Sequence, residues 1–215
     1  FDEFYSFDIQ DCETYGFRYL TNFIYLPKHE IPLEPYKTKA FVIQSKCNER
    51  IYTLSKIADQ FDRLGIENYE ILVYGKKQND INPHIVFKDQ RTSLEILKQK
   101  YIDSEIFVDL VRDGQLGLSF RIFEAMAMQK KIISTNQTLK DYDFYNSNNI
   151  LIIDKENPII DMNFLSNNYT PIPDEIYRKY FEQREFIELL KEKCLEKDVI
   201  IADLHKKIIE LTPDA

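Results

Sequence analysis

The chain has 215 residues and a net charge of −8, and 44% of its residues are hydrophobic while 30% are charged. This balance is typical of a water-soluble globular domain with its own core. The acidic charge argues against nucleic-acid binding, where contacts to phosphate supply most of the affinity, and the longest apolar runs are far shorter than the roughly 20 residues of a membrane-spanning helix.

Residues 1–39 are rich in aromatic side chains and then in proline, at Pro27, Pro32 and Pro35. We interpret this stretch as an inter-domain linker rather than a strand–helix unit. The first residue is Phe1 and not Met, which is consistent with a processed product or a part of a longer chain.

Between residues 40 and 172, short apolar runs alternate with segments of helical periodicity. Strands are expected at residues 40–44, 70–75, 106–110, 131–135 and 150–153. Helices are expected at residues 51–61, 92–101 and 118–129. This alternation predicts a doubly wound, Rossmann-like α/β domain with a parallel sheet covered on both faces. In such sheets, ligands bind outside the carboxyl ends of the strands, so the loops after these strands are the ones of interest.

Residues 173–215 form the third segment, with a final helix that starts at Pro173 and Asp174. From residue 187 a heptad pattern follows, in which seven of eight positions are apolar: Ile187, Leu190, Cys194, Lys197, Ile201, Leu204, Ile208 and Leu211. One interpretation is a coiled-coil seam that joins copies of the chain as a homo-oligomer. The other is an amphipathic helix that packs on its own domain, and the pattern favours neither.

The most informative segment is Gln115–Glu124, directly after the third expected strand. Gly114 and Gly117 are two of only five glycines in the chain, and glycine lets a backbone approach a ligand closely. Ser119 is a suitable N-cap for the next helix, so backbone N–H groups and the positive end of the helix dipole are available there for a diphosphate.

Helical spacing places Gly117, Arg121 and Glu124 at i, i+4 and i+7, on one face of that helix. Arg121 is suited to a phosphate, and Glu124 is suited to the hydroxyl groups of a ribose. A second, apolar face carries Phe120, Phe123 and Ala127. The alternative is an i,i+3 ion pair between Arg121 and Glu124 on a solvated face.

Two basic residues follow the first expected strand, Lys46 and Arg50, where they can reach the same diphosphate. Basic side chains are slightly unfavourable at a helix N-terminus unless an anion is present, which favours a binding role. The sequence Asp141-Tyr142-Asp143 is a DxD, but paired carboxylates in polar loops are more often turn formers than metal ligands.

Three cysteines, Cys12, Cys47 and Cys194, are far apart and form no CxxC pair. Their odd number is typical of free thiols in a reducing compartment, so we expect a cytoplasmic protein. The three histidines have no metal-ligand spacing. We expect neither a metal nor another cofactor.

The segment Gln115–Ala125, followed by Lys130–Ile133 and Asp143–Ile150, resembles bacterial glycosyltransferases of the lipopolysaccharide core biosynthesis type. The stretch from Phe7 to Phe17 resembles the inter-domain linker of the same family. The resemblance covers residues 5–190 and implies a GT-B architecture, in which two Rossmann-like domains enclose the active site. This chain would be the C-terminal, donor-binding domain.

The resemblance also implies roles for particular residues. The Gly-Leu-Ser-x-Arg loop of the family addresses the diphosphate of a nucleotide sugar, which places Gly117, Leu118, Ser119 and Arg121 in the site. We also expect Gln115, the first residue of the segment, to bind the nucleotide sugar. The family's glutamate near the ribose corresponds to Glu124, and its basic residue after the first strand corresponds to Arg50, with Lys46 nearby. A catalytic base usually comes from the acceptor-binding N-terminal domain, which we expect to be missing from this sequence.

The sequence therefore predicts a glycosyltransferase domain that binds a nucleoside-diphosphate sugar for transfer to a lipopolysaccharide or another surface-glycan acceptor, in the cytoplasm or peripherally at the inner membrane. The alternative is a non-catalytic nucleotide-binding or oligomerisation module. A flavodoxin-like receiver domain ranks lower, because the acidic cluster that such domains carry after the first strand is missing.

Overall fold

The computed structural model describes residues 3–211, and the side chains of residues 3–200. Its body is a six-stranded, fully parallel sheet in the order β5-β4-β3-β6-β7-β8. The strands are β3 (Thr38–Ser45), β4 (Tyr69–Tyr74), β5 (Ile85–Lys88), β6 (Ser104–Asp109), β7 (Lys131–Ser134) and β8 (Ile150–Ile152). This is the order of the doubly wound dinucleotide-binding sheet, and the predicted Rossmann-like α/β class is confirmed.

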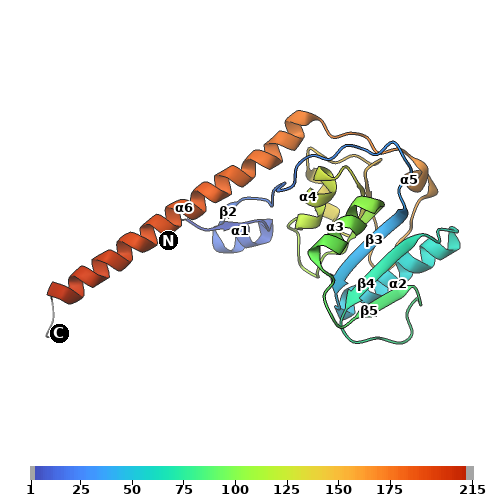
Figure 1. Cartoon of the computed structure of the whole chain (residues 1–215), viewed down its shortest axis with the longest axis horizontal. Coiled ribbons are helices and arrows are strands. Elements are labelled where there is room, and N and C mark those ends of the chain that lie inside the picture. Colours follow the sequence, from blue (N-terminus) through green and yellow to red (C-terminus); the bar gives the residue numbers. More distant parts are fainter. Residues whose placement is uncertain (1–2, 212–215) are drawn as a thin grey trace.

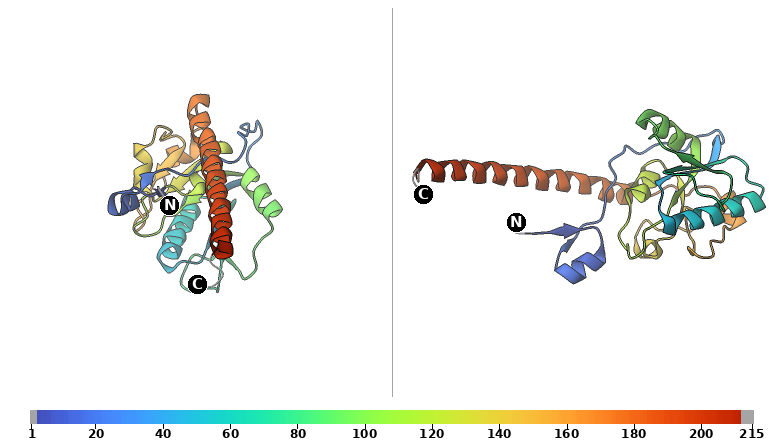
Figure 2. Two further views of the ribbon diagram at one scale, coloured as in Figure 1. Left: turned by 90° about the vertical axis from the view of Figure 1, so that its left-hand side faces the viewer. Right: turned by 90° about the horizontal axis from the view of Figure 1, so that it is seen from below.

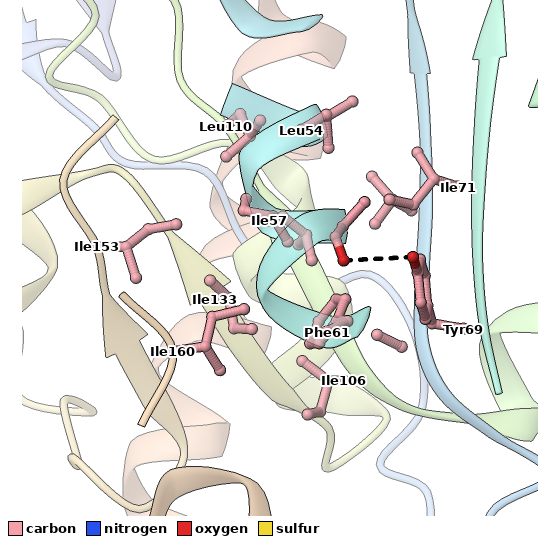
Figure 3. Packing of buried hydrophobic residues seen from close by; sticks show 14 of the residues in the cluster. Leu54, Ile57, Phe61, Tyr69, Ile71, Ile106, Leu110, Ile133, Ile153 and Ile160 are labelled. Atoms are coloured by element: carbon pink, nitrogen blue, oxygen red, sulfur yellow. Dashed lines mark hydrogen bonds between the residues drawn. The ribbon is translucent and has the colours of Figure 1, made fainter. Parts of the chain in front are cut away.

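Helices cover both faces of the sheet (Figure 1). They are α2 (Asn48–Arg63), α3 (Leu94–Asp103), α4 (Phe120–Ala127), the 3-10 helix η1 (Gln137–Asp141) and α5 (Met162–Ser166). Side chains alternate along a buried strand, so Ile106 and Val108 face α2 and α5, whereas Phe107 between them packs on the opposite face with α4. Figure 3 shows the first of these two cores, with Phe61 of α2 at its centre.

Two local predictions were wrong. Strand β5 was not expected, because it has only four residues and only one of them, Ile85, is buried. So short a strand leaves no apolar run in the sequence. Helix α3 begins after Ser93, whose Oγ accepts a hydrogen bond from the backbone N–H of Ile96. The helix therefore begins at Leu94 and ends at Asp103, two residues later at each end than expected.

The amino-terminal segment contains a small strand–helix–strand unit, which the linker interpretation excluded. It consists of β1 (Tyr5–Ser6), α1 (Ile9–Tyr15) and β2 (Arg18–Tyr19), and the two strands pair in parallel. Asp8 caps α1 by accepting from the N–H of Gln10, and Gly16 ends the helix with a φ of 71°. These two local signals account for the bounds of α1.

Helix α6 (Asp174–Leu211) starts where the sequence predicted and continues for 38 residues, about 57 Å at the usual helical rise. Its first turns pack on the body, where Tyr180 is buried, and the rest extends away from it (Figures 1 and 2). Leu195 and Val199 are 65% and 69% exposed. Among the described helices, none combines the length and the apolar sequence needed to cross a bilayer.

The predicted heptad is only partly visible in the structure. Ile187, Leu190 and Cys194 line a groove together with Tyr5 and Phe7 of the amino-terminal unit. The side chains of the later positions, Ile201, Leu204, Ile208 and Leu211, lie outside the described residues. The choice between a coiled coil and a helix packed on its own chain therefore stays a prediction.

Candidate functional site

The sheet has its topological switch point between β3 and β6, which are neighbours although the chain leaves them in opposite directions. A pocket of about 210 Å³ opens beyond the carboxyl ends of these two strands. We call it the switch-point pocket, and it is lined by Ile43, Gln44, Arg50, Val108, Asp109, Leu110, Ser119, Phe120, Arg121 and Glu124. Four of the eight predicted site residues, Arg50, Ser119, Arg121 and Glu124, thus come together where such folds bind ligands.

Arg121 is held firmly at the wall of this pocket. Its guanidinium donates a hydrogen bond to the hydroxyl of Tyr101 and lies 4.7 Å from the centre of that ring. The guanidinium also lies 5.9 Å from the centre of the Phe107 ring. Burial acts to lower the pKa of Arg121, but Tyr101 and Glu124 outweigh it and the pKa is raised. The side chain is therefore a fixed cation.

Glu124 forms the ion pair that the alternative interpretation predicted, since its Oε2 lies 3.6 Å from Arg121 Nε. The two side chains are only 20% and 21% exposed, so they do not lie on a solvated face. The other carboxylate oxygen, Oε1, accepts a 2.5 Å hydrogen bond from the hydroxyl of Tyr25. The carboxylate is thus oriented from two sides at the edge of the pocket.

Ser119 caps α4 as predicted, because its Oγ accepts from the backbone N–H of Arg121 at 3.2 Å. The same hydroxyl donates to Oδ1 of Asp109, the last residue of β6, at 2.7 Å. Ser134 on β7 donates to Oδ2 at 3.5 Å. Burial raises the pKa of Asp109, although these hydroxyls and the nearby Arg121 act to lower it. A buried acid of this kind was not expected from the sequence.

Two buried donors at the pocket have no hydrogen-bond partner in the described part of the chain. They are Nε of Arg50 and Nε2 of Gln44, a residue near the end of β3. Arg50 also donates through Nη1 to the carbonyl oxygen of Leu110 at 3.1 Å, which fixes its direction. A buried donor without a partner costs about 1–3 kcal/mol. These two donors are therefore suited to an oxygen-rich ligand.

Gly117 does not approach the switch-point pocket. A Cβ at this position would lie 2.5 Å from both the backbone oxygen and the ring of Phe7. The backbone N–H groups of Leu116 and Gly117 donate to Oδ2 of Asp8 at 2.8 and 3.0 Å. The missing side chain of Gly117 thus admits the amino-terminal unit, and Asp8 takes the amides expected to face a diphosphate.

The other three predicted residues lie away from the pocket. Lys46 packs against Gly75, where a Cβ would come within 2.9 Å of the Cβ of Lys46. Gln115 donates through Nε2 to the carbonyl oxygen of Gly117. Leu118 is fully buried in the core beside α4. These residues shape the loop around the pocket and do not line it.

Six of the ten lining residues were not predicted from the sequence, and three of these six, Gln44, Asp109 and Phe120, had a weak signal in it. Gln44 and Asp109 are polar residues that close otherwise apolar strands, at the edge where ligands bind. Phe120 was assigned to the core-facing stripe with Phe123, but its side chain is 41% exposed while Phe123 is fully buried. It is the first residue of α4, and it lines the pocket.

The DxD segment has a structural role in the described residues. Asp143 accepts hydrogen bonds from Lys179 Nζ at 2.5 Å and from the hydroxyl of Tyr180 at 2.7 Å. Both partners belong to α6, so this carboxylate fastens the start of that helix to the body. No group of three or more His, Cys, Asp or Glu side chains is arranged to hold a metal ion within the described residues.

No protein-family model matches the chain, and no curated protein does. Among solved structures, it is similar to a GtfA/B complex at 14% identity and a TM-score of 0.48, over 86% of this chain and 43% of that one. It is also similar to the C-terminal domain of a glycosyl transferase group 1 family protein (LpcC) from Francisella tularensis, at 12% identity and a TM-score of 0.38, over 61% and 77%.

A third similar structure is the pneumococcal O-GlcNAc transferase GtfA in complex with UDP and GlcNAc, at 13% identity and a TM-score of 0.45. That likeness covers 87% of this chain and 42% of the other. The chain thus spans less than half the length of the first and third of these proteins. The TM-scores of these similarities are 0.38–0.48, and we assign no function to the chain from them.

Proposed function

We propose that this chain is the donor-binding domain of a glycosyltransferase. It binds a nucleoside-diphosphate sugar in the switch-point pocket, for transfer to a lipopolysaccharide or another surface-glycan acceptor. The observation that carries the proposal is the pocket itself. Two arginines, Arg50 and Arg121, and the side-chain amide of Gln44 surround a cavity at the switch point of a Rossmann-like sheet. Among the described residues, Nε of Arg50 and Nε2 of Gln44 are buried donors without a partner. The lining segment also resembles the donor motif of the family.

The pocket is suited to stabilising a diphosphate leaving group. Fixed donors in a partly buried site are stronger than the same donors in water, and they need no rearrangement when charge develops. Arg121 is held by Tyr101, and Arg50 is held by the carbonyl oxygen of Leu110. Such a site supplies its hydrogen-bond donors and two guanidinium groups from the protein, so the proposal requires no metal. We expect the acceptor-binding site and the catalytic base to lie in a separate amino-terminal domain.

Nucleotide titrations test this proposal directly. A thermal-shift screen against UDP, GDP, ADP and CMP identifies the donor class, and calorimetry then gives the dissociation constant. Arg121→Ala should weaken binding of the best nucleotide by about 10- to 100-fold, because it removes charge-assisted hydrogen bonds worth about 1.5–3 kcal/mol. Lys46→Ala is a matched control outside the pocket. Equal affinity for Arg121→Ala and the wild type would rule out the donor site.

A second candidate, a non-catalytic assembly module, is favoured by one observation. The distal part of α6 carries exposed apolar side chains, with Leu195, Val199 and Ile200 at 65%, 69% and 58% exposed. An exposed apolar helix of this kind is suited to pairing with another helix. Sedimentation of the chain with and without residues 191–215 distinguishes the candidates. A tail-dependent dimer that binds no nucleotide would favour the assembly module.

A further inference from the structure

Three aromatic rings form a partly exposed surface next to the switch-point pocket. They belong to Phe23, Tyr25 and Phe120, and we call them the ring shelf. A second pocket of about 500 Å³ lies against them, and it is also lined by Glu124 and, on α6, by Arg184 and Glu188. A volume of this size is in the range of small-molecule sites.

The chain enforces the exposure of these rings. Ile24, between Phe23 and Tyr25, is fully buried and its backbone N–H donates to the carbonyl oxygen of Tyr180. The two aromatic neighbours of Ile24, in contrast, both line the second pocket. Tyr25 and Phe120 remain 39% and 41% exposed, whereas Phe23 is half-buried. The rings are thus held at the surface by a buried anchor.

The geometry of the shelf is ordered. The ring of Phe23 lies 5.4 Å from that of Phe120 at an angle of 88°, and the ring of Tyr25 lies 5.7 Å from it at 78°. Both are edge-to-face contacts, a favourable arrangement for aromatic pairs. The hydroxyl of Tyr25 is fixed on Glu124. The shelf therefore exposes aromatic surface without the rotational freedom of isolated side chains.

The ring shelf and the switch-point pocket are adjacent, because two residues line both. Phe120 and Glu124, one turn apart on α4, line both cavities. A ligand with a phosphate near Arg50 and Arg121 therefore has a carboxylate acceptor for hydroxyl groups beside it, and an aromatic surface directly beyond.

We propose that the ring shelf binds a ring of the same phosphate-bearing ligand that occupies the switch-point pocket. This inference rests on the proposed function. A nucleotide sugar has a ring on each side of its diphosphate, a nucleobase and a hexose, and both can stack on aromatic side chains. Stacking of a nucleobase on an aromatic ring is worth about 10-fold or more in affinity. Phe23, Tyr25 and Phe120 thus set which ring the site prefers.

Calorimetry with paired probes tests the shelf. Pyrophosphate is compared with UDP and GDP, and inorganic phosphate is compared with glucose 1-phosphate, so that each pair isolates what a ring adds. Phe23→Ala should leave pyrophosphate binding within about 2-fold and reduce the added affinity of one ring class about 10-fold. If the added affinity of UDP and GDP falls, the shelf binds the nucleobase. If the added affinity of glucose 1-phosphate falls, the shelf binds the hexose.

Two further variants control for folding. Phe23→Leu keeps the apolar bulk without a ring and should show the same loss, and Tyr52→Ala removes an exposed ring of α2 outside both pockets and should show none. If Phe23→Ala leaves the added affinity of both ring classes unchanged, the proposed role of the ring shelf is wrong, while the proposed function of the switch-point pocket is unaffected. A wild-type chain that binds neither pyrophosphate nor any nucleotide would overturn the proposed function, and the shelf with it.

Discussion

Ser119→Ala is the substitution whose cost follows most directly from the structure. The change removes the N-cap of α4, a loss of about 1 kcal/mol. It also removes the 2.7 Å hydrogen bond from Ser119 to Asp109, which leaves a buried carboxyl oxygen without its best donor. An unsatisfied buried acceptor costs about 1–3 kcal/mol. We therefore expect a loss of about 2–4 kcal/mol in the free energy of unfolding at neutral pH.

The assay is urea unfolding of the wild type and the variant, with Ser93→Ala as the control. Ser93 caps α3 in the same way, but its hydroxyl has no carboxylate partner among the described residues. Its loss should therefore cost only the capping contribution of about 1 kcal/mol. A cost for Ser119→Ala no greater than that for Ser93→Ala would refute the role assigned to Asp109.

The pH dependence of the Ser119→Ala cost provides a second check. The pKa of Asp109 is raised in the folded protein by burial, so folding takes up a proton, and this group stabilises the fold less as pH rises above its unfolded pKa. Removing the Ser119 hydroxyl penalises mainly the ionised carboxylate. The difference between variant and wild type should thus be larger at pH 8 than at pH 5.

The remaining predictions concern the amino-terminal unit and a buried lysine. Gly117→Ala places a methyl group against Phe7 and should lower the free energy of unfolding by about 1–3 kcal/mol. Amide hydrogen exchange should accelerate in α1 but not in α3. Equal protection of α1 in the variant and the wild type would contradict the contact. Burial lowers the pKa of Lys130 to about 7, so the stability of the fold should rise with pH above 7, by at most about 1.4 kcal/mol per unit. Urea unfolding at pH 7 and 9 should show that Lys130→Met abolishes this rise and that Lys98→Met, an exposed control, keeps it.

Local patterns were sufficient for five of the six strands and for four of the ten residues that line the pocket. Short apolar runs predicted five of the six strands, because a strand buried on both faces leaves a continuous hydrophobic signal. Ser119, Arg121 and Glu124 were found because a strand, a loop and a helix N-terminus follow each other directly in the sequence. The site residues that sequence spacing located are thus those close together along the chain.

Contacts between distant residues escaped the same reasoning. Asp8 binds amides that lie 108 and 109 positions further along the chain, so nothing local to Gly117 indicated that its space is already filled. Gln44 and Asp109 become site residues only once β3 and β6 are neighbours. A pattern that is read along one segment cannot show which strand lies beside it, and the sheet order had to come from the structure.

The charge of the switch-point pocket leads to a final prediction. Arg50 and Arg121 face two acids, Asp109 and Glu124, so the pocket has little net positive charge while both acids are ionised. An anion near Asp109 favours its protonated form, because like charges repel at short range. Binding of pyrophosphate should therefore be accompanied by proton uptake. The raised pKa of Asp109 makes its protonation easier. The affinity for pyrophosphate should therefore increase as the pH falls towards the pKa of Asp109.

Calorimetry in buffers of different ionisation enthalpy measures this proton uptake. Pyrophosphate takes up protons itself in this range, so the comparison that matters is between the wild type and Asp109→Asn, at the same pH and in the same buffers. The asparagine carries no charge and still accepts from Ser119, but it cannot take up a proton. We expect less proton uptake in this variant, together with tighter binding at pH 8, where the wild-type carboxylate opposes the anion most strongly. Equal uptake in both proteins would mean that Asp109 stays in one protonation state throughout, and that the arginines and the unpaired donors of Gln44 and Arg50 alone determine the affinity.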